Sequence, residues 1–318
     1  MSRSVSTGRL SVAAVTLAAL ALTACGGSKG SDAKTSPGSS SSGSAIPDTS
    51  SIVRAVSKDA TLAAAVPPAL SGKGTLTVGS NVQSPPNNFY GPDGKTAVGF
   101  EVDLITAVAA KLGMKVHYQD MSFDSLITSL ASGRIDTTIA GMNDTKERER
   151  KIDFIDYFNS GITIMIGKGN PKNIGSSMDL CGKKIAVVSG TTQEDFAKQQ
   201  SSKCQSGGKS ALQVTATDSD SQNQTQLRTG RVDAILNDLP TAVYISRTAG
   251  GGKYFQVVQQ APINGAPYGI GVAKTNKALS TAMQKALQEL INDGTYGKIL
   301  SAWQVTSGAL TKATVNGG

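Results

Sequence analysis

The sequence predicts an α/β protein of two lobes, each a mostly parallel sheet flanked by helices. Its 318 residues are enough for two domains with separate hydrophobic cores. Short apolar segments alternate with amphipathic helical segments from residue 75 to residue 236, and this alternation is typical of parallel sheets covered by helices. A helix–glycine–arginine–aspartate motif occurs twice along this stretch, which indicates two similarly wound lobes rather than one continuous sheet.

The first 24 residues have the pattern of a signal peptide. Arg3 and Arg9 precede an apolar stretch, residues 10–24, that is too short for a comfortable membrane span. The stretch ends in Cys25, and this ending resembles the bacterial lipobox, whose cysteine is acylated and becomes the new N-terminus. We therefore expect a lipid on Cys25 that anchors the mature protein to the outer face of the cell membrane. The alternative is a generic secretory signal with an accidental cysteine.

Residues 25–44 begin with the lipidated cysteine and consist mainly of glycine and serine. Such a chain buries too little apolar surface to offset its ordering entropy, so we expect a flexible tether. Residues 45–72 are a lead-in segment with one helical candidate, Ser50–Val66, which ends at Pro67-Pro68. The basic residues behind the net charge of +8 are scattered, so no nucleic-acid partner is indicated.

Two further cysteines, Cys181 and Cys204, are a natural disulfide pair in an oxidising compartment. A zinc site is not indicated, because these two thiols and one distant histidine, His117, do not provide its ligands. No Gly-x-Ser-x-Gly motif and no phosphate-binding loop occurs in the sequence. We expect no metal and no cofactor.

The body of the chain alternates between strand and helix patterns. Predicted strands cover residues 75–79, 115–118, 135–140, 184–188 and 232–236. Predicted helices cover residues 100–113, a segment from Ser122 to Gly133, a segment that begins at Thr191, and residues 219–229. The repeated motif reads Leu130-Ala-Ser-Gly-Arg-Ile-Asp136 in its first copy and Leu227-Arg-Thr-Gly-Arg-Val-Asp233 in its second. Coincidence is the alternative, because helix–glycine–strand junctions are common in α/β proteins.

Several motifs in a fixed order resemble family 3 of the bacterial extracellular solute-binding proteins, the polar amino-acid receptors of ABC importers. They are Leu76-Thr-Val-Gly79, Pro85-Pro86, Val98-Gly-Phe-Glu-Val-Asp-Leu104, Phe123–Leu130, Gly133-Arg-Ile-Asp136, Thr145-Lys-Glu-Arg148, Ile152-Asp-Phe154, Gly190-Thr-Thr-Gln193, Gly230–Asp238 and Ile291–Tyr296. The resemblance covers residues 73–304 and implies the two-lobed periplasmic-binding-protein-like fold of type II. It places lobe 1 at 73–164 plus 266–305, lobe 2 at 165–265 and a tail at 306–318. Two hinge crossings are expected near Thr163–Lys168 and Gln260–Tyr268.

The resemblance also implies which residues grip the zwitterionic end of the ligand. Arg148 is expected to hold the carboxylate through two parallel charge-assisted bonds; the alternative is a surface arginine in a charged run. Thr191-Thr-Gln-Glu194 matches a capping box, and Thr192 faces the same carboxylate from the start of a helix. Asp238, at the end of a predicted strand, takes the α-ammonium. The carbonyl of Gly141 and the backbone N–H of Asn143 contact the ammonium and the carboxylate respectively.

The residues expected around the ligand side chain depart from the family pattern. Asn81 stands where an acidic residue is frequent, and Ser84 stands where aromatic rings are commonest. Phe123 remains as one apolar wall, and Gln193 completes the expected ligand contacts. This predicts a pocket that is more polar and less acidic than one built for lysine or arginine, suited to an amide or another hydrogen-bonding side chain. A non-standard or modified amino acid stays open.

Taken together, the resemblance implies a monomeric receptor that captures a polar amino acid by hinge closure and delivers it to an ABC permease in the membrane. A receptor that presents its ligand to a signalling partner is one alternative. The other is a dehydratase-type enzyme on the same fold, which the sequence disfavours because His117, the only histidine, lies within a predicted strand.

Overall fold

A computed structural model describes residues 46–318 of the chain. The expected signal peptide, the lipidation site at Cys25 and the tether at 25–44 lie outside the described residues. Within the described part, none of the helices combines the length and the apolar character needed to cross a membrane.

Lobe 1 is built on three parallel strands. β1 (Thr75–Ser80) lies between β5 (Lys115–Asp120), which forms the edge, and β6 (Thr137–Thr138). The helices of this lobe are α4 (Phe100–Lys111), α5 (Leu126–Ala131), α6 (Lys146–Glu149), α10 (Lys277–Asn292) and α11 (Thr295–Ala302). A small antiparallel sheet accompanies them, made of β2 (Gln83–Ser84), β3 (Asn88–Tyr90) and β4 (Ala97–Val98). The predicted helix at 100–113 is confirmed, and its apolar stripe packs into the core because helical spacing places it on one face.

Lobe 2 repeats this plan with three parallel strands. β8 (Lys184–Val188) lies between β9 (Gln213–Thr217) and β10 (Ala234–Asp238). Its helices are α7 (Thr192–Ser206), α8 (Asp220–Arg228) and α9 (Leu239–Thr248). Separate apolar clusters fill the two faces of this sheet, one beneath α7 and one beneath α9. The two-lobed α/β fold predicted from the sequence is therefore confirmed. The prediction of separate sheets is wrong, because two connecting strands join the strands of both lobes into one hydrogen-bonded sheet.

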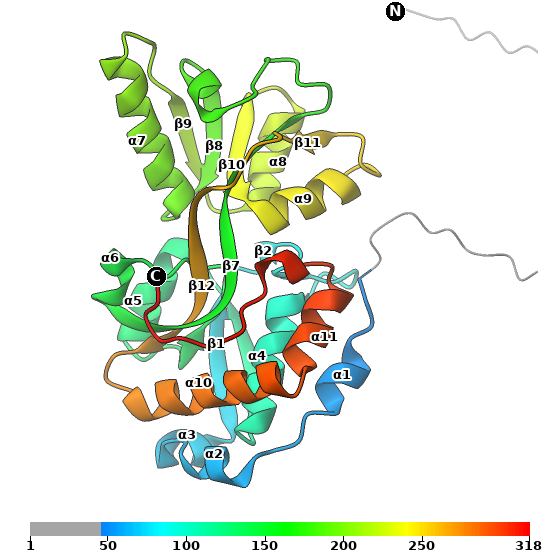
Figure 1. The fold of residues 1–318 in the computed structure, drawn as a ribbon, viewed down its shortest axis with the longest axis vertical. Helices are drawn as coiled ribbons and strands as arrows, with labels where there is room; N and C mark the ends of the chain where they lie inside the picture. Colours follow the sequence, from blue (N-terminus) through cyan, green and yellow to red (C-terminus); the bar gives the residue numbers. More distant parts are fainter. Residues whose placement is uncertain (1–45) are drawn as a thin grey trace, which may run out of the picture. The chain divides into compact units, whose positions relative to one another are not determined.

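Two long antiparallel strands connect the lobes. β7 (Ile152–Gly167) and β12 (Ile263–Ala273) run side by side from one lobe to the other (Figure 1), and the short β11 (Phe255–Val257) adds to β7. From Tyr268 onward β12 pairs with the first half of β7, whereas β10 of lobe 2 pairs with β7 from Ile162 onward. Ile162 of β7 pairs with Ile263 of β12 on one side and with Asp238 of β10 on the other. A register irregularity between Ile263 and Ala266 marks the same point on β12.

The repeated motif has the same backbone structure in both lobes. Gly133 and Gly230 have φ angles of +72° and +71°, in the left-handed region that glycine adopts at the end of a helix. Asp136 accepts a hydrogen bond from the N–H of Thr77 (2.8 Å) and donates its own N–H to the carbonyl of that residue (2.9 Å). Asp233 makes the same pair of bonds with Lys184, at 2.9 and 2.7 Å. Each aspartate therefore fixes the start of its strand against the neighbouring strand.

The lead-in segment differs from the single helix predicted at Ser50–Val66. It forms three short helices, which are α1 (Ser50–Arg54), α2 (Ala60–Ala64) and α3 (Pro68–Lys73). Asp59 starts a new helix because its side chain accepts the N–H of Leu62, at 2.8 Å. Pro68 begins α3 rather than only ending a helix, because proline is favoured at the first helical position.

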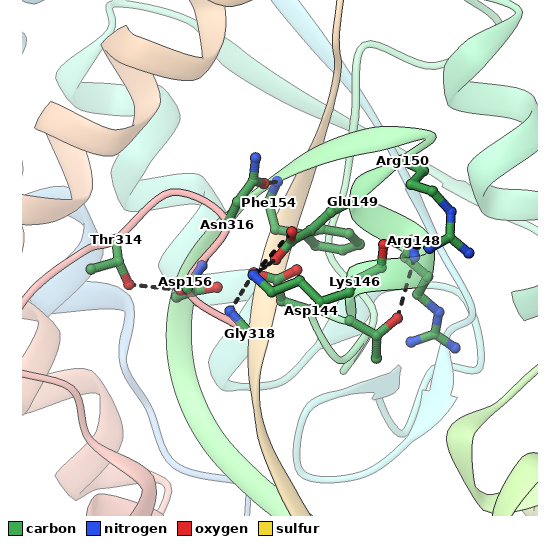
Figure 2. A network of polar contacts seen from close by, with 12 residues as sticks. Asp144, Lys146, Arg148, Glu149, Arg150, Phe154, Asp156, Thr314, Asn316 and Gly318 are labelled. Carbon is green, nitrogen blue, oxygen red and sulfur yellow. Dashed lines mark hydrogen bonds and ion pairs between the residues drawn. The ribbon is translucent and has the colours of Figure 1, made fainter.

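Residues 306–318, expected as a tail, pack against lobe 1 after a short 3₁₀ turn at Thr306–Gly308. Figure 2 shows the end of this segment against β7 and the loop before α6. Thr314 donates its hydroxyl to Asp156 (2.6 Å), and the N–H of Gly318 donates to Asp144 (3.0 Å). Asn316 exchanges hydrogen bonds with the backbone of Phe154. The segment therefore covers the strand and the loop that lead to α6.

The predicted disulfide between Cys181 and Cys204 is present, with an S–S distance of 2.00 Å. Cys181 follows a 3₁₀ turn at Ser177–Leu180, and Cys204 is buried on α7. The bond therefore ties the segment before β8 to the helix that follows that strand. His117 lies exposed on β5, the edge strand of lobe 1.

Candidate functional site

The candidate site is a cavity between the two lobes, lined by segments that follow the carboxyl ends of strands in both. Open α/β sheets present ligand contacts at this end of their strands. Every residue expected to contact the ligand lines the cavity, namely Asn81, Ser84, Phe123, Gly141, Asn143, Arg148, Thr192, Gln193 and Asp238. The cavity has a volume of about 40 Å³, and an adjoining hollow of about 690 Å³ shares several of its residues.

Arg148 lies where the two lobes meet at the cavity. Thr145 caps α6 by accepting the N–H of Arg148 (3.3 Å), which fixes the start of this short helix. The guanidinium donates from Nη1 to the carbonyl of Asn143 (2.9 Å) and from Nη2 to the carbonyl of Gly190 in lobe 2 (3.0 Å). The central carbon of the guanidinium, Cζ, lies 5.5 Å from the centre of the Phe123 ring. Burial lowers the pKa of Arg148 from its ordinary value, although an arginine stays protonated at neutral pH.

The start of α7 faces Arg148 from lobe 2. Thr191 caps this helix by accepting the N–H of Glu194 at 3.3 Å. The hydroxyl of Thr192 donates to the side-chain oxygen of Asn143 across the lobes, at 3.0 Å. The N–H groups of Thr192 and Gln193, which come first in the helix, make no hydrogen bond among the described residues. With the positive end of the helix dipole, they form a site suited to a carboxylate.

Asp238 ends β10 and is half-buried beside Gln193 and Tyr268. Burial raises its pKa to about 7, and Arg148 acts in the opposite direction as a nearby positive charge. Its Oδ1 atom has no hydrogen-bond partner among the described residues. A buried carboxylate oxygen without a partner is suited to an ammonium group placed in the cavity.

Gly141 and Asn143 bring backbone groups to the cavity from lobe 1. Gly141 has a φ of +59°, and a Cβ at this position would lie 2.8 Å from the side-chain nitrogen of Asn87, so glycine is required on both counts. Its N–H donates to the buried Glu101 (2.8 Å), whose pKa burial raises to about 7. The side chain of Asn143 bonds to Ala266 and Thr192, whereas its backbone N–H makes no hydrogen bond among the described residues.

Two further carboxylates, those of Asp144 and Asp156, form a second cluster where residues 306–318 cover lobe 1 (Figure 2). Burial raises the pKa of Asp144 to about 7 and also raises the pKa of Asp156. Both accept hydrogen bonds from the tail, which closes over them. Asp144 lies in the loop that leads into α6, the helix that carries Arg148, so the tail supports the segment that carries the guanidinium.

The structure also places in the cavity a carboxylate that the sequence analysis did not include. Asp220 begins α8, is 4% exposed and accepts hydrogen bonds from Ser84 of lobe 1 (2.8 Å) and Asn237 of lobe 2 (2.8 Å). Burial raises its pKa to about 6. The expectation of a less acidic pocket therefore does not hold for the whole lining, because Asp220 and Asp238 both line it.

The chain is similar to known amino-acid-binding proteins. The arginine-binding protein ArgT of Corynebacterium glutamicum is 30% identical over 254 residues, which are 80% of this chain and 82% of that protein. The L-cystine-binding protein TcyJ of Escherichia coli K12 is 32% identical over 232 residues, which are 73% of this chain and 83% of that protein.

Two solved structures extend the similarity to the fold. An ancestral arginine-binding protein bound to arginine is 40% identical, with a TM-score of 0.65, 72% of this chain covered and 98% of that one. The ancestral amino-acid-binding protein AncCDT-1, a precursor of cyclohexadienyl dehydratase, is 30% identical, with a TM-score of 0.67, 77% of this chain covered and 99% of that one. The profile of the bacterial extracellular solute-binding proteins, family 3, matches residues 76–306. This chain therefore belongs to family 3 of the bacterial extracellular solute-binding proteins.

Proposed function

We propose that this protein is the extracytoplasmic substrate-binding lipoprotein of an ABC importer and that it captures an amino-acid zwitterion between its two lobes. The observation that carries the proposal is that Arg148 from lobe 1 and Asp238 from lobe 2 line the same cavity. The carboxylate and the ammonium of an amino acid are only a few bonds apart. The protein therefore needs a positive and a negative group close together, and Arg148 and Asp238 supply them.

The carboxylate of the ligand binds Arg148 and the start of α7. A guanidinium has five N–H donors, and only two atoms of Arg148 are engaged by the carbonyls of Asn143 and Gly190. The N–H groups of Thr192, Gln193 and Asn143 add neutral donors around the same point. The ammonium of the ligand binds Asp238, whose buried oxygen has no partner among the described residues.

Closure of the lobes completes the site. Hydrogen bonds that cross between the lobes support this step, among them Arg148 to Gly190, Thr192 to Asn143 and Ser84 to Asp220. Among the described residues, β7 and β12 are the strands that join the two lobes. We expect rotation near Ile162 of β7 and near residues 263–266 of β12 to open the cavity with little change inside either lobe. The permease then recognises the closed form, and the lipid on Cys25 keeps the receptor near it.

A thermal-shift screen of the purified protein against the common amino acids tests the proposal. A ligand at 100 times its dissociation constant stabilises the protein by about 2.7 kcal/mol, which moves the midpoint by several degrees. If none of the amino acids raises the thermal midpoint, the proposal is contradicted.

The matched variants are Arg148→Ala and Arg150→Ala, because Arg150 is an exposed arginine next to the same short helix. Arg148→Ala weakens binding on the order of 100-fold or more, as expected when one partner of a buried charge pair is removed. Arg150→Ala binds as the unmodified protein does. Unchanged affinity in Arg148→Ala, with the fold intact, removes Arg148 from the site.

A further inference from the structure

Three charged side chains line the cavity, which are Arg148, Asp238 and Asp220. In the proposed function, the carboxylate of the ligand neutralises Arg148 and its ammonium neutralises Asp238. A zwitterion then has no charge left for Asp220. Neither Asp220 nor Asp238 forms an ion pair with a basic side chain among the described residues.

The partners of Asp220 are both neutral. One oxygen accepts the hydroxyl of Ser84 and the other accepts the side-chain amide of Asn237. An ionised carboxylate has two oxygens with about four acceptor positions in all, so each oxygen retains a position after these bonds. Two neutral hydrogen bonds orient the group without neutralising its charge. A buried carboxylate left in this state is costly unless a cation joins it.

Asp220 lies beside the residues expected to surround the ligand side chain. Ser84, which donates its hydroxyl to Asp220, belongs to the first loop of lobe 1. Asn237, which donates its side-chain amide to Asp220, comes directly before Asp238 in the chain. Asp220 is therefore a second carboxylate of the cavity, separate from the one assigned to the α-ammonium and in contact with the side-chain part of the site.

We infer that the ligand carries a second cation, a guanidinium or ammonium at the far end of its side chain, and that Asp220 of lobe 2 binds it. This inference rests on the proposed function and replaces the amide expected from the sequence. Asn81, which stands in the first loop where an acidic residue is frequent, bonds to the carbonyl of Met121 and supplies no charge. The negative charge is supplied by the opposite lobe instead. Pairing of the cation with Asp220 also joins the lobes, since Asp220 already bonds to Ser84 across them.

The test compares L-arginine with L-citrulline by calorimetric titration of the purified protein. The two have the same length and the same zwitterionic end, but citrulline carries a neutral urea group where arginine carries a guanidinium. The protein is expected to bind arginine on the order of 100-fold more tightly than citrulline, as expected for a buried charge pair. L-Lysine and L-glutamine provide a second cationic and neutral pair.

The variant is Asp220→Asn, and its matched control is Asp218→Asn, which removes the same charge from an exposed position two residues earlier. Asp220→Asn is expected to weaken arginine binding much more than citrulline binding, so that the selectivity collapses. Asp218→Asn retains the full selectivity.

Each outcome decides the inference. If arginine and citrulline bind equally well to the unmodified protein, the inference is overturned while the proposed function stands. If Asp220→Asn weakens both ligands equally, Asp220 acts on the shared α-ammonium, and the inference is again overturned. If no amino acid binds, the proposed function itself fails. The selectivity of the unmodified protein decides the matter even when Asp220→Asn does not fold.

Discussion

The two lobes share one backbone plan but bring opposite charges to the cavity. In both lobes a left-handed glycine ends a helix, and an aspartate then bonds twice to the neighbouring strand, through Asp136 in lobe 1 and Asp233 in lobe 2. Lobe 1 contributes the guanidinium of Arg148, whereas lobe 2 contributes Asp220 and Asp238. Hydrogen bonds at the starts of the strands thus position the backbone of each lobe. The segments after the carboxyl ends of the strands determine which charged side chains line the cavity. The two can therefore change independently.

The largest expected difference between the lobes comes from the disulfide, which lies entirely within lobe 2. The double variant Cys181→Ser/Cys204→Ser is expected to destabilise the protein by about 3 kcal/mol in the chain-entropy model, given a sequence separation of 23 between the cysteines. Hydrogen exchange should show the lost protection first in β8 and α7. Equal loss in β1 and α4 of lobe 1 would mean that the lobes unfold as one unit.

The repeated motif provides the next test. Asp136→Ala and Asp233→Ala each leave a strand N–H without its partner and are expected to lower the free energy of unfolding by about 2 kcal/mol. Each aspartate also pairs with one lysine, Lys73 or Lys172, so the two losses should be similar. Chemical denaturation measures both, with the exposed Asp218→Ala as the control, expected within about 0.5 kcal/mol of the unmodified protein. A large effect in only one lobe would show that the motif is structural in that lobe alone.

A smaller effect is expected at the bonds that cross between the lobes. Ser84→Ala removes the donor to the buried Asp220 and is expected to weaken ligand binding by about fivefold, close to 1 kcal/mol. Ser221→Ala removes another crossing bond, to Gln83, but this one is exposed and should change affinity little. Titration calorimetry separates the two. If both variants bind as the unmodified protein does, these bonds contribute nothing to the closed form.

The buried carboxylates of lobe 2 also predict a pH dependence of the unliganded protein. Burial raises the pKa of Asp238 to about 7 and that of Asp220 to about 6, above the ordinary value of 3.8. A carboxyl with a raised pKa in the folded state binds more protons there than in the unfolded state, so its contribution to stability is lost as the pH rises from about 4 to about 7. The thermal midpoint without ligand should therefore fall between pH 5 and pH 8, and Asp238→Asn should flatten this slope.

When the ligand is bound, its contribution to stability changes with pH in the opposite direction, because the ligand ammonium favours the ionised form of Asp238. Ligand binding then releases a proton below pH 7, and the stabilisation by ligand should be larger at pH 8 than at pH 5. A ligand-induced shift that is independent of pH would argue against an ammonium contact at Asp238.

The apolar strands and the long amphipathic helices could be predicted from the sequence, because their hydrophobic periodicity is strong. The strand β9 (Gln213–Thr217) was not predicted, since it lies at the edge of the sheet and has little apolar character. Asp220 was missed for the same reason. Without the strand before it, nothing in the sequence indicates that Asp220 follows a strand end and points inward, as Asp238 does, whereas the nearby Asp218 is exposed.

Arg148, unlike Asp220, could be predicted as a site residue, but only from the resemblance to the family. Composition alone places it in a charged surface run, and only the resemblance to the family singles it out from Arg150. The prediction of a single helix at Ser50–Val66 was wrong because the cap at Asp59 and the helix start at Pro68 are local effects that hydrophobic periodicity does not report. The packing of residues 306–318 depends on hydrogen bonds to Asp144 and Asp156, which are far away in the sequence.

The most direct test of the opposed charges of the two lobes is a crystal structure of the protein with the amino acid that stabilises it most. We expect the ligand carboxylate on the guanidinium of Arg148 and the N–H of Thr192, with the α-ammonium within hydrogen-bond distance of Asp238. A ligand held in the reverse orientation, or bound outside the cavity between the lobes, would contradict it.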